Sequence, residues 1–315
     1  MIHSPKKPTT SLRISGRFPD VSGLGRAADF DLGFRQLDKG DPTVQATLLF
    51  GSNITLGRMR FDRRFHQLGM PPAGKLTFGI PFFGLTEWFG REYQRSSILP
   101  FNHSGGIDGV SESNFEAITI SFSEAHLNEV SKNFGIPVST ALFCPTPESV
   151  IERGEFSERL RGMLVKMFAD PKFELTPQTE DGLIGTLLHA AQNVSVAPDR
   201  SSPRLRAQAV QRALAYIADH PGDGVTVRDI CSENNIPLRT LNRAFNERFG
   251  MGPKAYLKQQ RLSAVRAELL HRPPEVRVGD VANHWGFWHL GQFASDYQKF
   301  FGELPSQTIS KYRFG

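Results

Sequence analysis

Three side chains near the C-terminus have the types and the spacing to read DNA bases. Arg239, Asn242 and Arg243 stand at i, i+3 and i+4, so on a helix they would share one face. A guanidinium can make two hydrogen bonds to O6 and N7 of guanine, and an asparagine amide can do the same with N6 and N7 of adenine. A solvated polar face is the alternative interpretation. The choice depends on the element that carries these residues.

An internal repeat predicts that element. The residues that recur at an offset of 52 are Leu241, Phe245, Phe249, Gly250 and Pro253, which return as Phe293, Tyr297, Phe301, Gly302 and Pro305. The first three of each set are spaced i, i+4 and i+8, which predicts one buried face of a helix. The glycine suits a helix C-terminus with positive φ, and the proline suits the start of the next helix.

Each predicted helix follows a short helix and a turn. In the first unit, 226–249, the short helix covers 226–231, and Asn234-Asn235 forms the turn. In the second unit, 278–301, the short helix covers 278–284, and Gly286 forms the turn. Two helices joined by a tight turn form a helix-turn-helix, whose second helix enters the major groove. A long helix over 253–270 joins the units, and another over 205–217 precedes them.

With these motifs, the region from about 203 to 313 resembles the DNA-binding domain of the AraC/XylS family. The matching residues are Ile230-Cys231, Leu241-x-Arg243-x-Phe245, Gly250-x-x-Pro253-x-x-Tyr256, Arg261-Leu262, Val281-Ala282, Gly286-Phe287, Phe293-x-x-x-Tyr297 and Phe301-Gly302-x-x-Pro305. The stretch 285–293 is also similar to a subgroup that includes the ethanolamine-operon regulator. The sequence departs from the family at Asn235, where glycine is usual, and at Pro237, where serine is usual.

The resemblance implies that residues 239, 242 and 243 read bases, together with their equivalents in the second unit. Those equivalents are Gly291, Ala294 and Ser295, small groups that can make few bidentate contacts. We expect His289 and Leu290 to contribute to base reading beside Gly291 and Ser295. Contacts to the DNA backbone are predicted for Thr240, Lys254, Lys258 and Lys299, although lysines on such helices can also be merely solvated.

The fold class is predicted to be α+β. Residues 1–28 are expected to form a mobile tail. A domain over 29–194 has β-rich stretches at 44–50, 76–80 and 117–120 and helical patterns from 123 to 194. The polar segment 195–203 is the predicted linker to an all-α domain over 204–315, with two helix-turn-helix units joined by a long helix. The family resemblance implies that the first domain is a cupin-like barrel that binds an effector and dimerises.

Candidate residues for those two roles follow from the sequence. An aromatic-rich group could line an effector pocket or could be ordinary barrel core: Phe78, Phe82, Trp88, Phe89 and His103. A helical apolar stripe could pack against a second copy of the chain or against its own barrel: Leu183, Ile184, Leu187 and Leu188. His66, His103 and His126 lack the close spacing of metal ligands, so we predict no metal site and no cofactor.

Composition narrows the class of protein. The net charge is +5, and residues 201–315 hold 16 Lys/Arg against 10 Asp/Glu, which suits a DNA-binding end. No apolar stretch is long enough to cross a membrane, no secretory signal is evident, and two cysteines form no disulfide framework. We therefore expect a cytoplasmic, dimeric transcription regulator, an activator that responds to a small molecule and engages promoter DNA and RNA polymerase.

Two other classes stay open. A cupin-like domain can retain enzymatic chemistry, although the sequence has no nucleophile motif and no Gly-rich phosphate loop, and we predict no enzyme. An architectural DNA-binding protein without effector control is the second alternative. A reporter that responds to a small molecule would favour a regulator, whereas turnover of that molecule would favour an enzyme.

Overall fold

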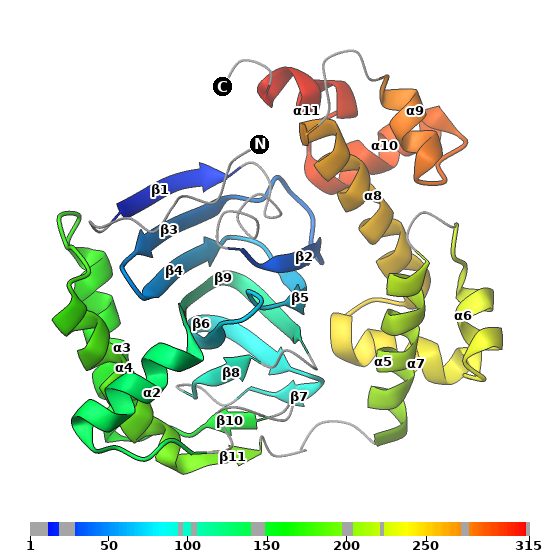
Figure 1. Ribbon diagram of the computed structural model, residues 1–315. Helices are drawn as coiled ribbons and strands as arrows, with labels where there is room; N and C mark the ends of the chain where they lie inside the picture. Colours follow the sequence, from blue (N-terminus) through cyan, green and yellow to red (C-terminus); the bar gives the residue numbers. More distant parts are fainter. Residues whose placement is uncertain are drawn as a thin grey trace. The chain divides into compact units, whose positions relative to one another are not determined.

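The computed structural model describes residues 12–18, 29–93, 97–101, 106–139, 149–196, 204–220, 224–271 and 277–312. The chain divides into two compact units (Figure 1). The first comprises Met1–Phe34, Thr43–Asp62 and Gln67–Asp199, and the second comprises Arg35–Pro42, Arg63–His66 and Arg200–Gly315. The predicted α+β class is confirmed, because the first unit is built on a sheet and the second on helices.

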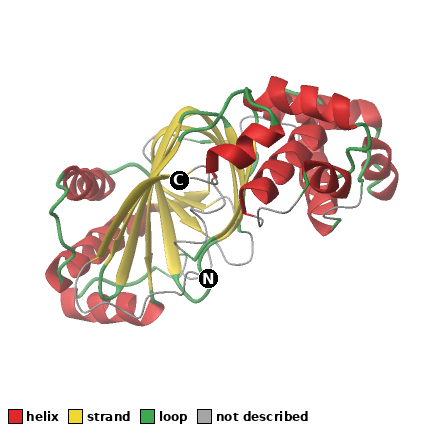
Figure 2. Cartoon of the chain, turned by 90° about the horizontal axis from the view of Figure 1, so that it is seen from above, coloured by secondary structure: helices red, strands yellow, loops and turns green. Residues whose placement is uncertain are grey.

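A nine-stranded sheet forms the first unit. Its order is β1-β3-β4-β9-β5-β2, with β6 beside β9 and with β7 and β8 beside β6. The strands are β1 (Leu12–Phe18), β2 (Asp31–Gln36), β3 (Val44–Phe50), β4 (Ile54–Phe61), β5 (Phe65–Met70), β6 (Leu76–Trp88), β7 (Arg91–Glu92), β8 (Leu99–Phe101) and β9 (Ile107–Phe122). Figure 2 shows these strands in yellow as one curved layer. The curvature agrees with the register shifts in the β6–β9 pairing after Pro81.

Residues 12–18 differ from the expected mobile tail. They form β1, which pairs antiparallel with β3 from Leu12↔Phe50 to Phe18↔Val44. Leu12 and Ile14 lie exposed on this edge strand. The strand is difficult to find in the sequence because arginine, serine and glycine separate its few apolar residues, and pairing with a distant strand holds it in place.

Three helices cover one face of the sheet: α2 (Glu124–Phe134), α3 (Glu155–Ala169) and α4 (Pro177–Ala190). Ser123 caps α2 by accepting a hydrogen bond from the amide of His126, as its position predicts. Buried Glu180 on α4 accepts hydrogen bonds from the backbone amides of Ser52 and Asn53 at 2.7 and 3.2 Å. This carboxylate therefore fastens α4 to the turn between β3 and β4. A short ladder of β10 (Ser149–Ile151) and β11 (Val194–Val196) completes the unit, with a 3-10 turn at Ala191–Asn193.

Alternation along the central strands separates two layers of side chains. Phe78 and Ile80 on β6, with Ile118 on β9, point into the core beneath the helices. Their neighbours Gly79 and Pro81 face the other side of the sheet, where they line a small cavity. The central strands are therefore buried on both faces.

The second unit contains seven helices within its described residues. They are α5 (Arg204–Asp219), α6 (Val227–Glu233), α7 (Leu238–Phe249), α8 (Pro253–His271), α9 (Val278–His284), α10 (Leu290–Phe301) and α11 (Pro305–Tyr312). The helical pairs α6–α7 and α9–α10 are the two predicted helix-turn-helix units. The long helix α8 runs between them and packs against both, through Tyr256 in the first and Val265 in the second.

The repeat forms the core of this unit, as its periodicity predicts. Leu241, Phe245 and Phe249 are fully buried on α7. Their equivalents on α10 are also buried: Phe293, Tyr297 and Phe301. Gly250 and Gly302 end the two helices in the left-handed conformation, with φ of 72° and 80°.

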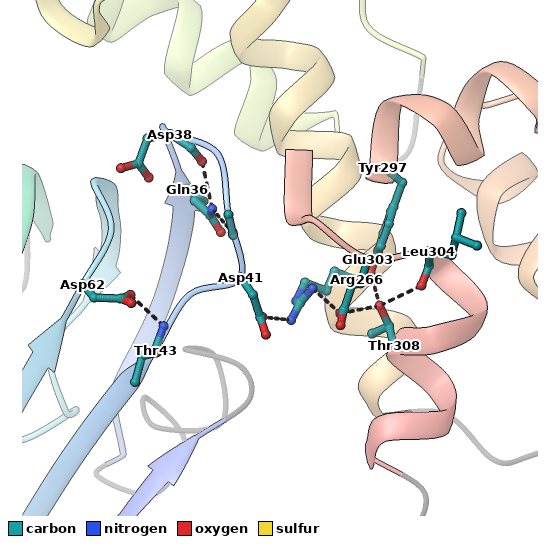
Figure 3. A network of polar contacts seen from close by, with 11 residues as sticks. Gln36, Asp38, Asp41, Thr43, Asp62, Arg266, Tyr297, Glu303, Leu304 and Thr308 are labelled. Atoms are coloured by element: carbon teal, nitrogen blue, oxygen red, sulfur yellow. Dashed lines mark hydrogen bonds and ion pairs between the residues drawn. The ribbon is translucent and has the colours of Figure 1, made fainter. Parts of the chain in front are cut away.

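A buried arginine organises polar contacts beside the second helix-turn-helix (Figure 3). The guanidinium of Arg266 on α8 pairs with Glu303 at 2.7 Å and with Asp41, which belongs to a short segment grouped with this unit. Glu303 in turn accepts a hydrogen bond from Thr308, whose hydroxyl also contacts the Tyr297 hydroxyl at 2.9 Å. Burial raises the pKa of Tyr297 to about 12, so its phenol stays neutral at physiological pH. These contacts tie α8, α10 and α11 together.

Candidate DNA interface

The first recognition helix, α7, separates its residues by face. Leu241, Phe245 and Phe249 are buried, whereas Arg239 and Arg243 are exposed and Asn242 is half-buried. The three predicted base readers therefore lie together on the solvent side. Arg243 is held along the helix by an ion pair from its Nε to Glu247 at 3.0 Å, four residues on.

A capping box and a left-handed residue set the direction of α7. Thr226 begins the short helix α6, where its hydroxyl accepts from the Asp229 amide and the Asp229 carboxylate accepts from the Thr226 amide at 2.8 Å. Asn235 adopts φ of 51°, the conformation that the family usually assigns to glycine. Pro237 precedes α7 and offers no side-chain cap. The predicted turn is thus present, with both departures from the family accommodated.

The second recognition helix, α10, presents a different surface. Gly286 has φ of 79° in its turn, as predicted. His289, Leu290 and Gly291 are exposed, and Ser295 is half-buried. A Cβ added at Gly291 would meet no atom within 4 Å, so the helix offers an open position there. This surface is open at Gly291 and holds few groups for bidentate contacts.

Two exposed side chains, one at each recognition helix, were not among the residues predicted from the sequence. Leu238 opens α7, and Trp288 stands two residues before α10. The signal was available, because the short helices of the two units are offset by 51 residues and the recognition helices by 52. An extra residue therefore had to lie in the second turn.

The predicted backbone contacts lie in varied surroundings. Lys254 and Lys299 are exposed, and Thr240 is half-buried. Lys258 already forms an ion pair with Asp296 on α10 at 2.6 Å. Burial alone would raise the pKa of Asp296, but hydrogen bonds from Lys258 and Gln292 hold that pKa below its usual range. Lys258 therefore has a structural partner that competes with a phosphate.

The predicted effector residues divide between the two faces of the sheet. Phe78 and Phe82 pack with the core beneath the helices, and Phe82 also stacks under Arg161. Trp88 and Phe89 belong to a second cluster, in which Trp88 stacks on Phe101. His103 lies outside the described residues.

Of the four predicted residues that the structure describes, Trp88 alone lines a cavity of about 30 Å³ in the first unit. Its remaining walls are mostly apolar: Phe30, Leu32, Met59, Gly79, Pro81, Leu85, Leu99, Phe101, Ile107, Gly109, Phe115 and Ala117, with the polar Gln67 and Thr119. The side chain of Gln67 is 8% exposed, and its Nε2 is buried without a hydrogen-bond partner. The cavity thus pairs an apolar wall with one buried donor.

The helical stripe considered for dimerisation is buried within the chain itself. Its four residues, Leu183, Ile184, Leu187 and Leu188, are at most 1% exposed and pack with the sheet, α2 and α3. A side chain that its own core already covers is unavailable to a second copy. The stripe therefore follows the alternative interpretation, packing on its own sheet.

The described residues also bear on a metal site and a membrane-spanning helix. Within those ranges, no group of three or more His, Cys, Asp or Glu is arranged to hold a metal ion. No described helix is long and apolar enough to span a membrane.

Comparisons with known proteins assign the C-terminal region. A family model described as a helix-turn-helix domain matches residues 230–311. The chain is 29% identical over 140 residues to the "Probable thc operon regulatory protein" of Rhodococcus erythropolis, covering 44% of this chain and 42% of the relative. It is 31% identical over 102 residues to a "XylDLEGF operon transcriptional activator" of Pseudomonas putida, covering 32% and 31%. The transcriptional activator RhaS of Escherichia coli O157:H7 is 33% identical over 92 residues, covering 29% and 32%.

Solved structures give two further comparisons. A structure described as a probable AraC family transcriptional regulator from Rhodopseudomonas palustris is 30% identical, covers 33% of this chain and 97% of that chain, and has a TM-score of 0.31. ToxT from Vibrio cholerae is 9% identical over 96% of this chain and 98% of its own, with a TM-score of 0.32. The chain spans less than half the length of the three relatives compared above. Through its C-terminal helix-turn-helix domain, the chain belongs to the AraC/XylS family of transcription regulators.

Proposed function

We propose that the protein is a sequence-specific transcription regulator that binds promoter DNA with α7 and α10. The observation that carries this proposal is the set of exposed Arg239 and Arg243 with half-buried Asn242, on a helix whose opposite face is fully buried. In a helix-turn-helix the N-terminal part of the second helix contacts base edges, and these residues lie in its first half. The excess of positive charge in residues 201–315 supports binding to a polyanion.

The full-length chain tests this proposal. We expect it to bind a duplex selected from random-sequence DNA, and the affinity to fall steeply as salt rises, because cationic side chains release counterions from phosphate. The triple variant Arg239→Ala, Asn242→Ala, Arg243→Ala should lose its preference for the selected duplex. Arg159→Ala, an exposed arginine on α3, is the matched control and should keep that preference. Absence of any DNA binding at low salt would overturn the proposal.

The proposal extends to a small-molecule effector in the cavity of the first unit. The unpartnered Nε2 of Gln67 supports this, because a buried amide without a partner is costly and an acceptor on a ligand would satisfy it. Among the described residues, no charged side chain lines the cavity, so a neutral molecule with one hydrogen-bond acceptor fits its chemistry. The volume holds about two waters, so a larger effector requires wall residues such as Phe101 or Met59 to move.

Thermal melting of the full chain tests the effector site with paired probes. We expect 2-butanone and cyclohexanone to raise the melting temperature, and butyrate and cyclohexanecarboxylate to have no effect. Gln67→Leu, which removes the donor at similar volume, should abolish the response to the ketones. Stabilisation by the carboxylates, or an unchanged response in Gln67→Leu, would contradict this ligand class.

Partners and activity complete the proposal. Because relatives are described as transcriptional activators, we propose activation through RNA polymerase and no enzymatic role. We also propose a homodimer, for which sedimentation of the full chain is the measurement. A monomer at the concentrations that occupy the selected DNA would exclude it.

A further inference from the structure

The exposed apolar side chains described in the second unit lie at or just before the N-termini of the two recognition helices. Among its described residues, three large hydrophobic side chains are exposed: Leu238 at 55%, Trp288 at 75% and Leu290 at 45%. Leu238 is the first residue of α7, and Leu290 is the first residue of α10. The two leucines are equivalent in the repeat, at the 52-residue offset. The ends of the helices that enter DNA therefore carry apolar groups in both units.

Trp288 is an additional residue of the second turn. Helices α6 and α9 are offset by 51 residues, as are the left-handed residues Asn235 and Gly286. The next amides keep this offset, since those of Ile236 and Phe287 donate to the carbonyls of Cys231 and Ala282 at 3.0 and 2.9 Å. From the recognition helices onward the offset is 52. Trp288 is the residue that this change inserts.

The inserted Trp288 lies just before the small residues of α10 in the sequence. Gly291, Ala294 and Ser295 occupy the positions where α7 has Arg239, Asn242 and Arg243. They leave the second helix without long polar groups at these three positions, and the nearby indole of Trp288 and side chain of Leu290 are exposed to solvent. In the major groove, the apolar group that distinguishes a base is the 5-methyl of thymine.

We propose that the second helix-turn-helix recognises thymine methyl groups through Trp288 and Leu290. This inference rests on the proposed DNA-binding function. Leu238 makes the same kind of contact in the first unit, beside the bidentate readers of α7. Sequence preference in the second half of the site thus arises from apolar contact, whereas preference in the first half combines apolar contact with hydrogen bonding.

Deoxyuridine tests the proposal, because it pairs as thymine does and lacks only the methyl group. The probe is a duplex selected from random DNA by the full chain, in which each thymine is replaced singly by deoxyuridine. For the wild-type protein we expect about three- to fourfold weaker binding at one or two positions in the half-site of the second unit. Leu290→Ala and Trp288→Ala should each reduce the ratio between thymine and deoxyuridine at such a position towards one.

Matched variants keep the test sharp. Leu238→Ala should remove deoxyuridine sensitivity only in the half-site of the first unit. Trp288→Gln keeps a side chain of some length without the indole, and an unchanged melting temperature shows that the fold is intact. The proposal predicts that Trp288→Gln behaves as Trp288→Ala does.

The outcomes separate this inference from the proposed function. If the wild-type protein binds specifically but no single deoxyuridine replacement lowers its affinity, the methyl-reading proposal is wrong and the proposed DNA-binding function is retained. If the wild-type protein shows no sequence-specific DNA binding, the proposed DNA-binding function is wrong. If the Trp288 and Leu290 variants keep the wild-type deoxyuridine response but fail to activate transcription with RNA polymerase, the apolar surface serves the polymerase and the proposal is wrong.

Discussion

The two helix-turn-helix units share a buried frame and differ on the surface. Phe245 and Tyr297 hold the same place in the repeat, and both are fully buried. Arg243 and Ser295 also hold the same place, yet one is a long cation and the other a small hydroxyl. Burial constrains shape at the first pair, whereas solvent leaves the second pair free to diverge. The comparison shows that one buried scaffold can present two chemically different surfaces.

The largest expected effect tests the shared frame. Phe245→Ala removes a ring that lies 5.4 Å from the rings of both Phe249 and Tyr256. We expect a loss of about 3–5 kcal/mol in the free energy of unfolding of the second unit. The variant loses the burial of the ring and leaves a cavity that the neighbouring helices fill only in part. Tyr297→Ala should cost a similar amount. Denaturant unfolding of the full chain, followed by circular dichroism, measures both.

Glu233→Ala is the surface control for that experiment. Glu233 is exposed at the end of α6, so its replacement should change the stability by less than about 0.5 kcal/mol. A cost below 1 kcal/mol at either Phe245 or Tyr297 would show that the repeat does not pack equally in the two units.

The next effect tests the difference between the two surfaces. Arg243→Ala should relax the preference at one or two base pairs by about 1–3 kcal/mol, because a bidentate contact is lost only at the base it reads. Selection from random DNA measures this directly. Glu247→Gln removes the charge that pairs with Arg243 and leaves the guanidinium in place, so it should retain the preference. An unchanged motif with Arg243→Ala would remove Arg243 from the proposed base readers of α7.

The sequence predicted the elements whose information is local. Periodic burial located α7 and α10, and Asn235 and Gly286 marked the turns because few residue types adopt positive φ. Features that depend on distant partners were not accessible. Strand β1 is held in place by pairing with β3. Leu187, a candidate interface residue, is covered by the sheet and helices of its own unit. The side chain of Gln67 could not be identified as a candidate ligand contact from the sequence, because the cavity that it lines is formed by strands far apart in the chain.

A smaller effect concerns how the short helices begin. Thr226 caps α6 through its hydroxyl, whereas Arg277 precedes α9 without a side-chain cap. Thr226→Ala should therefore destabilise the first helix-turn-helix by about 1 kcal/mol. Arg277→Ser should stabilise the second by about a few tenths of a kcal/mol. Thermal melting of each variant measures the change. Equal and negligible shifts would show that the caps do not distinguish the two units.

The same cap predicts a dependence on pH. Hydrogen bonds from the Thr226 side chain and then from its backbone amide hold the pKa of Asp229 below its ordinary value. A carboxyl whose folded pKa is depressed stabilises the fold above its unfolded pKa, and that contribution disappears as the pH falls through the folded pKa. The difference in stability between wild type and Thr226→Ala should consequently be present at neutral pH and shrink below about pH 4.

The smallest expected effect is the sharpest test of the contrast between the units. Ser295 stands where α7 carries Arg243, but its hydroxyl is short and half-buried, so it cannot grip a base with two hydrogen bonds. Ser295→Ala should therefore change the affinity for the selected duplex by less than about twofold and leave the preferred sequence unchanged, as expected for a surface site without a directional contact. Ser295→Arg places the long donor of the first unit on the second and should add a preference for guanine at one base pair. Selection from random DNA with wild type and both variants decides the matter. If Ser295→Ala erases one half-site, then α10 reads bases through this hydroxyl, and the division of labour between polar and apolar reading is wrong.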